Sequence, residues 1–368
     1  MYLLTFIFPV LWTAFATSLT AAERSEMSLA QAFERFFPIG MGIGPQDLNR
    51  PKVWQLVQHH CRQVTIENHL KPSLVQPAPG LWTFERGDEL VKAARQAGLR
   101  VHGHTLLWHR QSPEWMVKDS DGRYLPAEVV LGHIRDHIQG VMGHYARDIH
   151  SWDVVNEVLA DGPSPSDYRQ SDWYQAAGFD YILTAFLAAA EAQPQALLFY
   201  NDYGLETEPK RSRALRLIER LRAAGARVDG IGIQAHLQIG SPPIEEIGES
   251  IRAFAAAGLK VHISELDVSV HPWRRVGSEL LDEDRRYEEG LTHETEQRLA
   301  QRYADLFRLF MEHHQHIWAV TFWNTHDGRS WLNNFPVRSR VDHPLLFDRQ
   351  LRPKQAFSAV IEVSAESP

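Results

Sequence analysis

Short apolar runs alternate with longer amphipathic segments along most of the chain after residue 35. Eight short runs have the pattern of buried β-strands, and they span residues 38–42, 63–67, 100–106, 151–156, 196–201, 230–234, 260–266 and 317–323. The clearest segments with helical periodicity span residues 84–98, 180–193, 208–225, 245–258 and 294–313. Strict alternation of strands and helices predicts a parallel sheet.

Eight strand–helix units favour an α/β fold made of a single (β/α)8 TIM barrel. The alternative is an open, doubly wound sheet. That alternative is weakened because no glycine-rich phosphate loop follows the first predicted strand: Gly40 and Gly42 lie within the strand, and no third glycine completes the motif. The length of 368 residues is compatible with one barrel domain.

Polar and aromatic residues follow seven of the eight predicted strands at their carboxyl ends. This is the end where barrel enzymes place their active sites. The residues are Glu67 and Asn68, His104, Trp108 and His109, Asn156 and Glu157, Asn201, Asp202 and Tyr203, Gln234 and His236, Glu265 and Asp267, and Trp323, Asp327 and Trp331. Two long connections, 161–178 and 269–293, would wall a groove at this end or simply decorate the surface.

Two glutamates, Glu157 and Glu265, are the candidates for chemistry. Each lies at the end of a strand-like run, where a charged residue rarely packs into a core. They are 108 residues apart, which corresponds to about three β/α units in a barrel of typical size, so they would face each other across its mouth. Paired carboxylates are what a glycosidase needs: the charge of one raises the pKa of the other and keeps it protonated. Sequence does not measure the gap that separates retaining from inverting enzymes.

Other residues near these ends could serve the same site. The amide of Asn156 could bond a sugar hydroxyl, and His236 with Asp267 could hold Glu265 ionised and oriented. Alone, His236 would be interpreted as a core histidine. Trp108, Trp323 and Trp331 are interpreted either as floors for sugar rings or as packing.

The pair His102 and His104, with His109 nearby, allows a metal site as an alternative. Barrel metal hydrolases are expected to carry such a pair on the first strand, and here it falls on the third. We therefore predict no metal ligands.

The net charge and the amino-terminal segment bear on which partners the protein binds and where it is located. A net charge of −8 argues against nucleic acid or an anionic membrane surface as partner. Cys61 is the only cysteine, so no internal disulfide is possible.

Residues 2–19 are almost wholly apolar and are followed by the small residues 20–22, a pattern typical of a signal peptide although no basic residue precedes it. An uncleaved anchor or a misassigned start are the alternatives. We expect a signal peptide over residues 1–22, a catalytic domain over 23–368, and export to the periplasm or the exterior.

Seven segments in order resemble the endo-β-1,4-xylanases of glycoside hydrolase family 10. They are 65–72 (TIENHLKP), 102–109 (HGHTLLWH), 152–157 (WDVVNE), 201–203 (NDY), 232–237 (GIQAHL), 263–267 (ISELD) and 322–331 (FWNTHDGRSW). The resemblance implies a (β/α)8 barrel that hydrolyses xylan or xylo-oligosaccharides with retention, without a cofactor. It implies Glu157 as acid/base and Glu265 as nucleophile.

The same resemblance implies a set of substrate-binding residues. They are Glu67, Asn68, Lys71, His104, Trp108, Asn156, Tyr203, Gln234, His236, Asp267, Trp323 and Trp331. Leu70 stands where the family usually has methionine, a volume-conserving departure expected to matter little. Asn324 stands where glycine is common, and Gly204 stands where asparagine is common. Neither touches the carboxylates, but both could retune sugar contacts. No carbohydrate-binding module is visible.

Three other functions stay open at this point. The first is a barrel glycosidase for another β-1,4 polymer such as cellulose or mixed-linkage glucan. The second is a metal hydrolase that uses His102 and His104. The third is a non-catalytic sugar-binding protein, against which the presence of both glutamates argues. Oligomeric state is not predicted.

Overall fold

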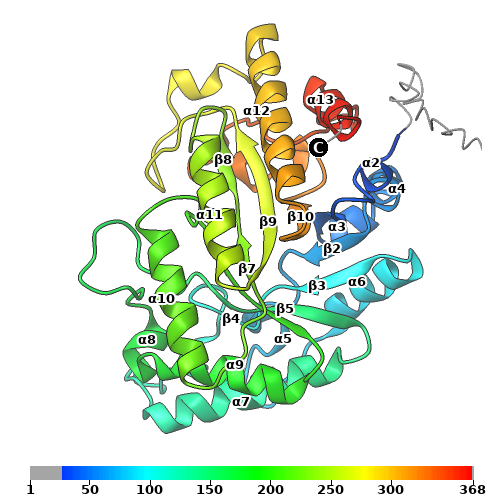
Figure 1. Ribbon diagram of the computed structural model, residues 1–368. Helices are drawn as coiled ribbons and strands as arrows, with labels where there is room; N and C mark the ends of the chain where they lie inside the picture. Colours follow the sequence, from blue (N-terminus) through cyan, green and yellow to red (C-terminus); the bar gives the residue numbers. More distant parts are fainter. Residues whose placement is uncertain (1–26, 367–368) are drawn as a thin grey trace, which may run out of the picture.

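Eight parallel strands form a closed barrel in the computed structural model, which describes residues 27–366 (Figure 1). Their order around the barrel is β10-β1-β2-β3-β5-β6-β7-β9, and pairing of β9 with β10 closes the cylinder. The strands are β1 (Ile39–Ile43), β2 (Gln63–Ile66), β3 (Arg100–Gly103), β5 (Ile149–Asn156), β6 (Leu197–Asp202), β7 (Gly230–Ile233), β9 (Lys260–Ser269) and β10 (Ile317–Phe322). This confirms the predicted barrel and excludes the open sheet.

Two short strands extend the barrel wall at its carboxyl end. β4 (Leu107–Trp108) pairs with the end of β5, and β8 (His236–Gln238) pairs with the end of β9. Both follow a break in the preceding strand, and at the second break Ala235 has a left-handed φ of 59°. These extensions carry Trp108 and His236, two of the predicted site residues, onto the rim of the barrel.

Helices lie between the strands and cover the outside of the barrel (Figure 1). They are α2 (Leu29–Ala32), α3 (Pro45–Leu48), α4 (Pro51–His60), α5 (Pro72–Val75), α6 (Glu85–Gln96), α7 (Ala127–His144), α8 (Asp172–Ala177), α9 (Asp180–Ala192), α10 (Lys210–Ala223), α11 (Ile244–Ala256), α12 (His293–Glu312) and α13 (Gln355–Ser364). Amphipathic spacing explains their orientation: in α6, Leu90, Val91 and Ala94 are buried against the barrel while charged residues face outward. Gly98 ends this unit with a φ of 72°, a conformation that glycine adopts without strain.

Side chains fill the barrel interior in layers, as expected for a barrel of this size. Near the amino-terminal end, the rings of His102, Phe199, His262 and Trp318 contact one another with centroids 4.9 to 6.1 Å apart. The strands are buried on both faces, which explains their nearly continuous apolar runs. The interior is therefore a packed core, and the polar side chains gather above it at the mouth.

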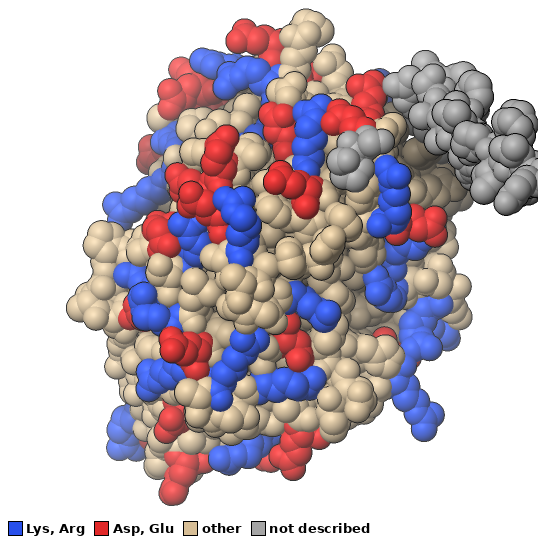
Figure 2. All heavy atoms as spheres, viewed as in Figure 1, with Lys and Arg blue, Asp and Glu red and all other residues tan. Residues whose placement is uncertain are grey.

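Acidic and basic side chains are interspersed on the face of the molecule shown in Figure 2. That face presents no extended basic field of the kind that binds nucleic acid. Between residues 27 and 366 the helices are all too short or too polar to cross a lipid bilayer. The predicted signal peptide, residues 1–22, lies outside the described residues.

Candidate active site

Glu157 directly follows β5, Glu265 lies within β9, and the two belong to one hydrogen-bond network. The side-chain amide of Asn201 donates to Glu265 Oε1 at 2.8 Å and to Asn156 Oδ1 at 3.0 Å. The amide of Gln234 donates to Asn156 Oδ1 at 3.3 Å and to Glu157 Oε1 at 3.2 Å. Three neutral amides, those of Asn201, Asn156 and Gln234, thus connect the carboxylates, so the structure brings together the pair that the sequence singled out.

The end of β5 is irregular, and this irregularity aims Glu157. The pairing of β5 with β6 shifts register between Asp153 and Val155, and Glu157 itself has a left-handed φ of 58°. Such a conformation costs free energy in a non-glycine residue and persists only where the surroundings hold it. Here the Arg169 Nε donates to the Glu157 carbonyl at 2.9 Å, and the Glu157 amide donates to the Asn201 carbonyl at 2.9 Å.

The surroundings of Glu157 favour its protonated form. Its side chain is 12% exposed, and Trp108 Nε1 donates to its Oε2 at 2.9 Å. Burial raises the pKa of the Glu157 carboxyl, and the negative charge of Asp202 raises that pKa further. Tyr200 hydrogen-bonds Asp202, and Lys210 Nζ lies 2.7 Å from it. Hydrogen bonds from Trp108 and Gln234 act in the opposite direction but do not cancel the rise. A carboxyl with a raised pKa holds its proton to a higher pH, which suits a general acid.

Glu265 has the opposite surroundings. Burial alone would raise its pKa, but hydrogen bonds from His236 and Asn201 and the nearby His104 outweigh that effect, and the pKa of Glu265 lies below its usual value. The Asn201 amide reaches it because Gly232 leaves room: a Cβ there would lie 2.1 Å from Asn201 Oδ1. Glu265 is therefore ionised and held in place, as a nucleophile requires.

His236 supplies the charge that holds Glu265 ionised. Its Nε2 lies 3.2 Å from Glu265 Oε2, and its Nδ1 lies 3.0 Å from Asp267 Oδ2. Burial opposes the charged imidazolium, but Asp267 and Glu265 together raise the pKa of His236 to about 10. Trp331 Nε1 donates to the same Asp267 oxygen at 2.8 Å. The predicted grouping of His236, Asp267 and Glu265 is thus present.

A second polar cluster lies at the ends of β2 and β10. Lys71 Nζ donates to Asn68 Oδ1 at 3.0 Å and lies 4.6 Å from the centre of a Trp108 ring. Burial lowers the pKa of Lys71, although the carboxylates of Glu265, Glu67 and Glu157 act in the opposite direction. Glu67 Oε2 accepts from Arg329 Nη2 at 2.9 Å. These charged groups present donors and acceptors that match sugar hydroxyls.

Trp323 and Trp331 each pack against a histidine of the site. Trp323 is 6% exposed, with the His104 ring 5.4 Å from it. The Trp331 ring lies 4.7 Å from the His236 ring, tilted by 55° to it, and stacks on Phe335 at 4.9 Å with ring planes 24° apart. Whether Trp331 also forms a floor for a sugar ring stays a prediction.

His104 and Tyr203 complete the predicted set, and each has partners that fix its orientation. His104 Nδ1 lies 2.8 Å from Asp153 Oδ2. The Tyr203 hydroxyl donates to Asp161 at 2.7 Å and accepts from Arg169 at 2.7 Å. The structure places all twelve candidate substrate residues around the barrel mouth or directly behind it, and their contacts with sugar stay predictions.

His102 and His104, the pair behind the alternative metal site, both contact Asp153. His102 lies one layer below His104, its Nε2 is 3.1 Å from Asp153 Oδ1, and its Nδ1 is 2.9 Å from Ser151 Oγ. No group of three or more potential metal ligands occurs among residues 27–366. Both histidines hold the same carboxylate of Asp153, which gives them a structural role.

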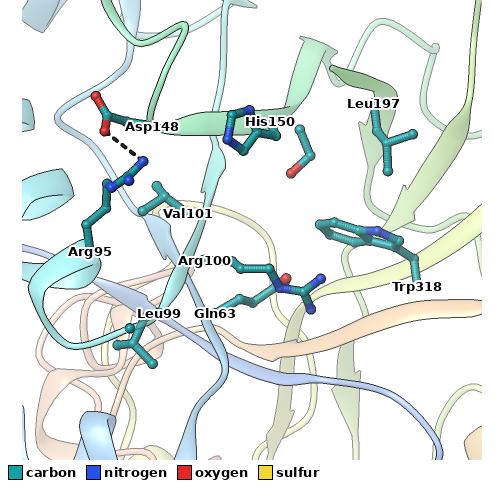
Figure 3. Close-up of a pocket in the computed structure, with 11 residues that line it drawn as sticks. Gln63, Arg95, Leu99, Arg100, Val101, Asp148, His150, Leu197 and Trp318 are labelled. Carbon is teal, nitrogen blue, oxygen red and sulfur yellow. Dashed lines mark ion pairs between the residues drawn. The ribbon is translucent and has the colours of Figure 1, made fainter. Parts of the chain in front are cut away.

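A cavity of about 370 Å³ lies at the other end of the barrel, near the strand amino termini (Figure 3). Its lining includes Arg100, His150 and Trp318. Its one carboxylate, Asp148, pairs with Arg95 at 2.8 Å, as the dashed line in Figure 3 marks. Without a second carboxylate in its lining, this cavity lacks the means for glycoside hydrolysis.

Several groups important to the site were missed or undervalued in the sequence. Asn201 is not among the predicted catalytic or substrate-binding residues, yet its amide donates to both Glu265 and Asn156. Arg169, within the long connection 161–178, binds the Glu157 backbone. Asp47 follows β1, the one strand thought to deliver nothing, and accepts from Arg329 Nε at 3.2 Å. No periodic signal marks these residues, because their roles depend on contacts between distant segments.

A closed (β/α)8 barrel with two carboxyls at its mouth, one with a raised pKa and one with a lowered pKa, is the arrangement of a glycoside hydrolase. The model of glycosyl hydrolase family 10 matches residues 28–363, and the chain belongs to that family.

Named relatives agree with this assignment. The chain is 38% identical over 335 residues to endo-1,4-beta-xylanase B of Paenibacillus barcinonensis, covering 91% of this chain and 97% of that one. It is 36% identical over 349 residues to a thermostable celloxylanase of Thermoclostridium stercorarium, covering 92% and 87%. A solved family 10 endoxylanase from a sugarcane soil metagenome superposes with a TM-score of 0.87 at 33% identity, covering 92% of this chain and 99% of that chain.

Proposed function

We infer that this protein hydrolyses internal β-1,4-xylosidic bonds of xylan with retention at the anomeric carbon. The observation that carries the inference is the hydrogen-bond network that joins Glu157 and Glu265 at the barrel mouth, in surroundings that raise the pKa of the first and lower that of the second. The family match and the named xylanases support the substrate class.

The reaction has two displacements. In the first, a Glu265 oxygen attacks the anomeric carbon while the glycosidic C–O bond breaks and the Glu157 proton passes to the leaving oxygen. In the second, water attacks the glycosyl ester, its proton passes to Glu157, and Glu265 leaves as carboxylate. Both residues return to their starting states, so no external reactant besides water is required.

The neighbouring groups would bind the sugar. We propose that the polar side chains around Glu265 bond its hydroxyls and that the aromatic side chains bound the groove. The residues in this proposal are Glu67, Asn68, Lys71, His104, Trp108, Asn156, Tyr203, Gln234, His236, Asp267, Trp323 and Trp331. Lys71 and Asn68 are already paired at 3.0 Å, so their side chains need little reordering when substrate binds.

Trapping the intermediate tests the assignment of Glu265 as the nucleophile, and the anomer released first tests retention. A 2-deoxy-2-fluoro xylobioside with a good leaving group should form a stable ester, and mass spectrometry of peptides should locate it on Glu265. Proton NMR during hydrolysis of xylohexaose should show the β-anomer first. Initial release of the α-anomer, or a label on another residue, would contradict the mechanism.

A second substrate is favoured by one specific observation, the relative named as a celloxylanase. Xylose and glucose units differ by one hydroxymethyl group, which must pass the wall formed near Trp331. Reducing-sugar release from carboxymethylcellulose, compared with xylan at equal enzyme concentration, separates a strict xylanase from an enzyme that also cuts glucan. Product profiles on arabinoxylan and glucuronoxylan would then define which substituents the groove accepts.

We also propose that the protein is exported. The apolar run over residues 2–19, followed by the small residues 20–22, is the observation behind this proposal. Expression of the full chain should yield a mature protein that begins near residue 23, as determined by amino-terminal sequencing of the exported fraction. A full-length product retained in the cytoplasm would contradict export.

A further inference from the structure

Asn324 occupies a backbone conformation that is unfavourable for its residue type. It lies directly after β10 and Trp323, it is 1% exposed, and its φ is 99°. An L side chain at such a φ costs free energy that glycine would not incur. A buried asparagine held there needs contacts that offset this cost.

The side chain of Asn324 makes two such contacts, to two different parts of the site. Its Nδ2 donates to Glu67 Oε2 at 3.2 Å, and its Oδ1 accepts from the Trp331 backbone amide at 3.2 Å. Glu67 follows β2 and Trp331 follows β10, so one side chain joins two walls of the mouth that are far apart in sequence. Its own backbone amide donates to the Phe322 carbonyl at 3.1 Å, which fixes the side chain to the end of the strand.

Both partners of Asn324 connect to charged groups of the catalytic machinery. Trp331 Nε1 donates to Asp267, the carboxylate that bonds His236 beside the nucleophile. Glu67 pairs with Arg329 at 2.9 Å. The backbone and indole N–H bonds of Trp331 fix where this side chain lies relative to Glu67.

We propose that Asn324 is a positioning residue that sets the spacing between Glu67 and the side chain of Trp331, and so sets the affinity for the sugar that Glu265 attacks. This proposal rests on the xylanase function argued above. Asn324 touches neither glutamate of the catalytic pair in the contacts described, so it should act on sugar binding more than on bond cleavage.

The test compares Asn324→Gly with Ser339→Gly. Glycine at 324 relieves the backbone strain and removes both hydrogen bonds. Ser339 lies in the same connection after β10, has a φ of 60°, and is exposed, so its replacement relieves similar strain away from the site. Steady-state hydrolysis of p-nitrophenyl β-xylobioside, with active enzyme counted by titration with the fluoro sugar, separates KM from kcat.

Asn324→Gly should raise KM about five- to tenfold, because it removes a hydrogen bond to a charged group and frees the Trp331 loop. Its kcat should stay within about twofold, and Tm should move by less than about 4 °C. Ser339→Gly should leave KM unchanged. Asn324→Asp, which keeps the acceptor for Trp331 but places a carboxylate against Glu67, should raise KM at least as much as the glycine variant.

An unchanged KM in Asn324→Gly would overturn the proposal, and so would an equal KM rise in Ser339→Gly or wild-type behaviour of Asn324→Asp. A failure of the wild-type protein to release p-nitrophenol from the xylobioside would instead overturn the proposed function. The two failures are thus distinguishable in one experiment.

Discussion

Glu157 and Glu265 are the same residue type at equivalent ends of two barrel strands, yet their neighbours carry opposite charges. Glu157 has the carboxylate of Asp202 nearby, and burial together with that charge raises its pKa. Glu265 has the imidazolium of His236 at 3.2 Å, and this bond helps to lower its pKa despite deeper burial.

The comparison shows that strand position brings the two carboxyls together, while the next layer of residues assigns their roles. A carboxyl in a low-dielectric site takes the protonation state that its nearest charged neighbour favours. We therefore expect Asp202 and His236 to determine the roles of Glu157 and Glu265. Replacing either should change the difference in pKa between the two glutamates.

Removal of the carboxyls should have the largest effect and should be asymmetric. Glu265→Ala should reduce kcat on every xyloside by about 10⁴-fold or more, because no covalent intermediate forms. Glu157→Ala should reduce xylan hydrolysis by about 10²- to 10⁴-fold, with a smaller loss on aryl xylobiosides whose leaving groups need no proton in the first step. Near-full turnover in either variant would refute the role given to that residue.

Loss of the cation beside Glu265 should have the next largest effect. His236→Gln can still donate a hydrogen bond but carries no charge, so kcat/KM should fall by about 10- to 100-fold. The lowered pKa of Glu265 keeps it ionised as the pH falls, so without the cation it should protonate at a higher pH. The acidic limb of the pH profile should therefore move upward, and an unmoved limb would show that His236 does not control ionisation.

Loss of the anion beside Glu157 should change the pH profile more than the rate at the optimum. Asp202→Asn removes a negative charge that favours the protonated acid, so the pKa of Glu157 should fall and the alkaline limb of kcat/KM should move to lower pH. Lys210 keeps a partner in Asp161 at 3.2 Å. Asp229→Asn, which lies before β7 at the other end of the barrel, provides the control and should leave the limb in place.

The smallest effect is expected at the amino-terminal end of the barrel. Arg95→Ala breaks the ion pair with Asp148, whose side chains are 48% and 36% exposed. Exposed pairs contribute at most about 1 kcal/mol, so urea unfolding should show a change no larger than that and kinetics should be unchanged. A loss of activity would show that the two ends of the barrel are coupled.

The sequence predicted the barrel well because its strands are buried on both faces and bounded by turns. The expected run at 230–234 became β7 (Gly230–Ile233), and that at 317–323 became β10 (Ile317–Phe322). The helices α4 (Pro51–His60) and α7 (Ala127–His144) were not among the clearest predictions. In α7 the buried His137 and the interior glycines weaken the apolar stripe on which such predictions rest.

The site was predictable where chemistry is carried by strand ends, and not where it depends on contacts between loops. Glu157 and Glu265 stand out as charges at the ends of apolar runs. Arg169 and Arg329 lie among many surface arginines, and only the folded chain shows that one bonds the Glu157 carbonyl and the other Glu67. The pKa directions likewise depend on three-dimensional neighbours.

The packing of Trp331 bears on how this enzyme's specificity could change. An indole held by Asp267 and stacked on Phe335 can select substrates by occupying the volume that a bulkier ring substituent would need. Such steric exclusion depends on rigidity. Small losses of order around the indole would then broaden the range of accepted polysaccharides while both carboxyls stay in place, a route to new activity that does not require rebuilding the catalytic centre.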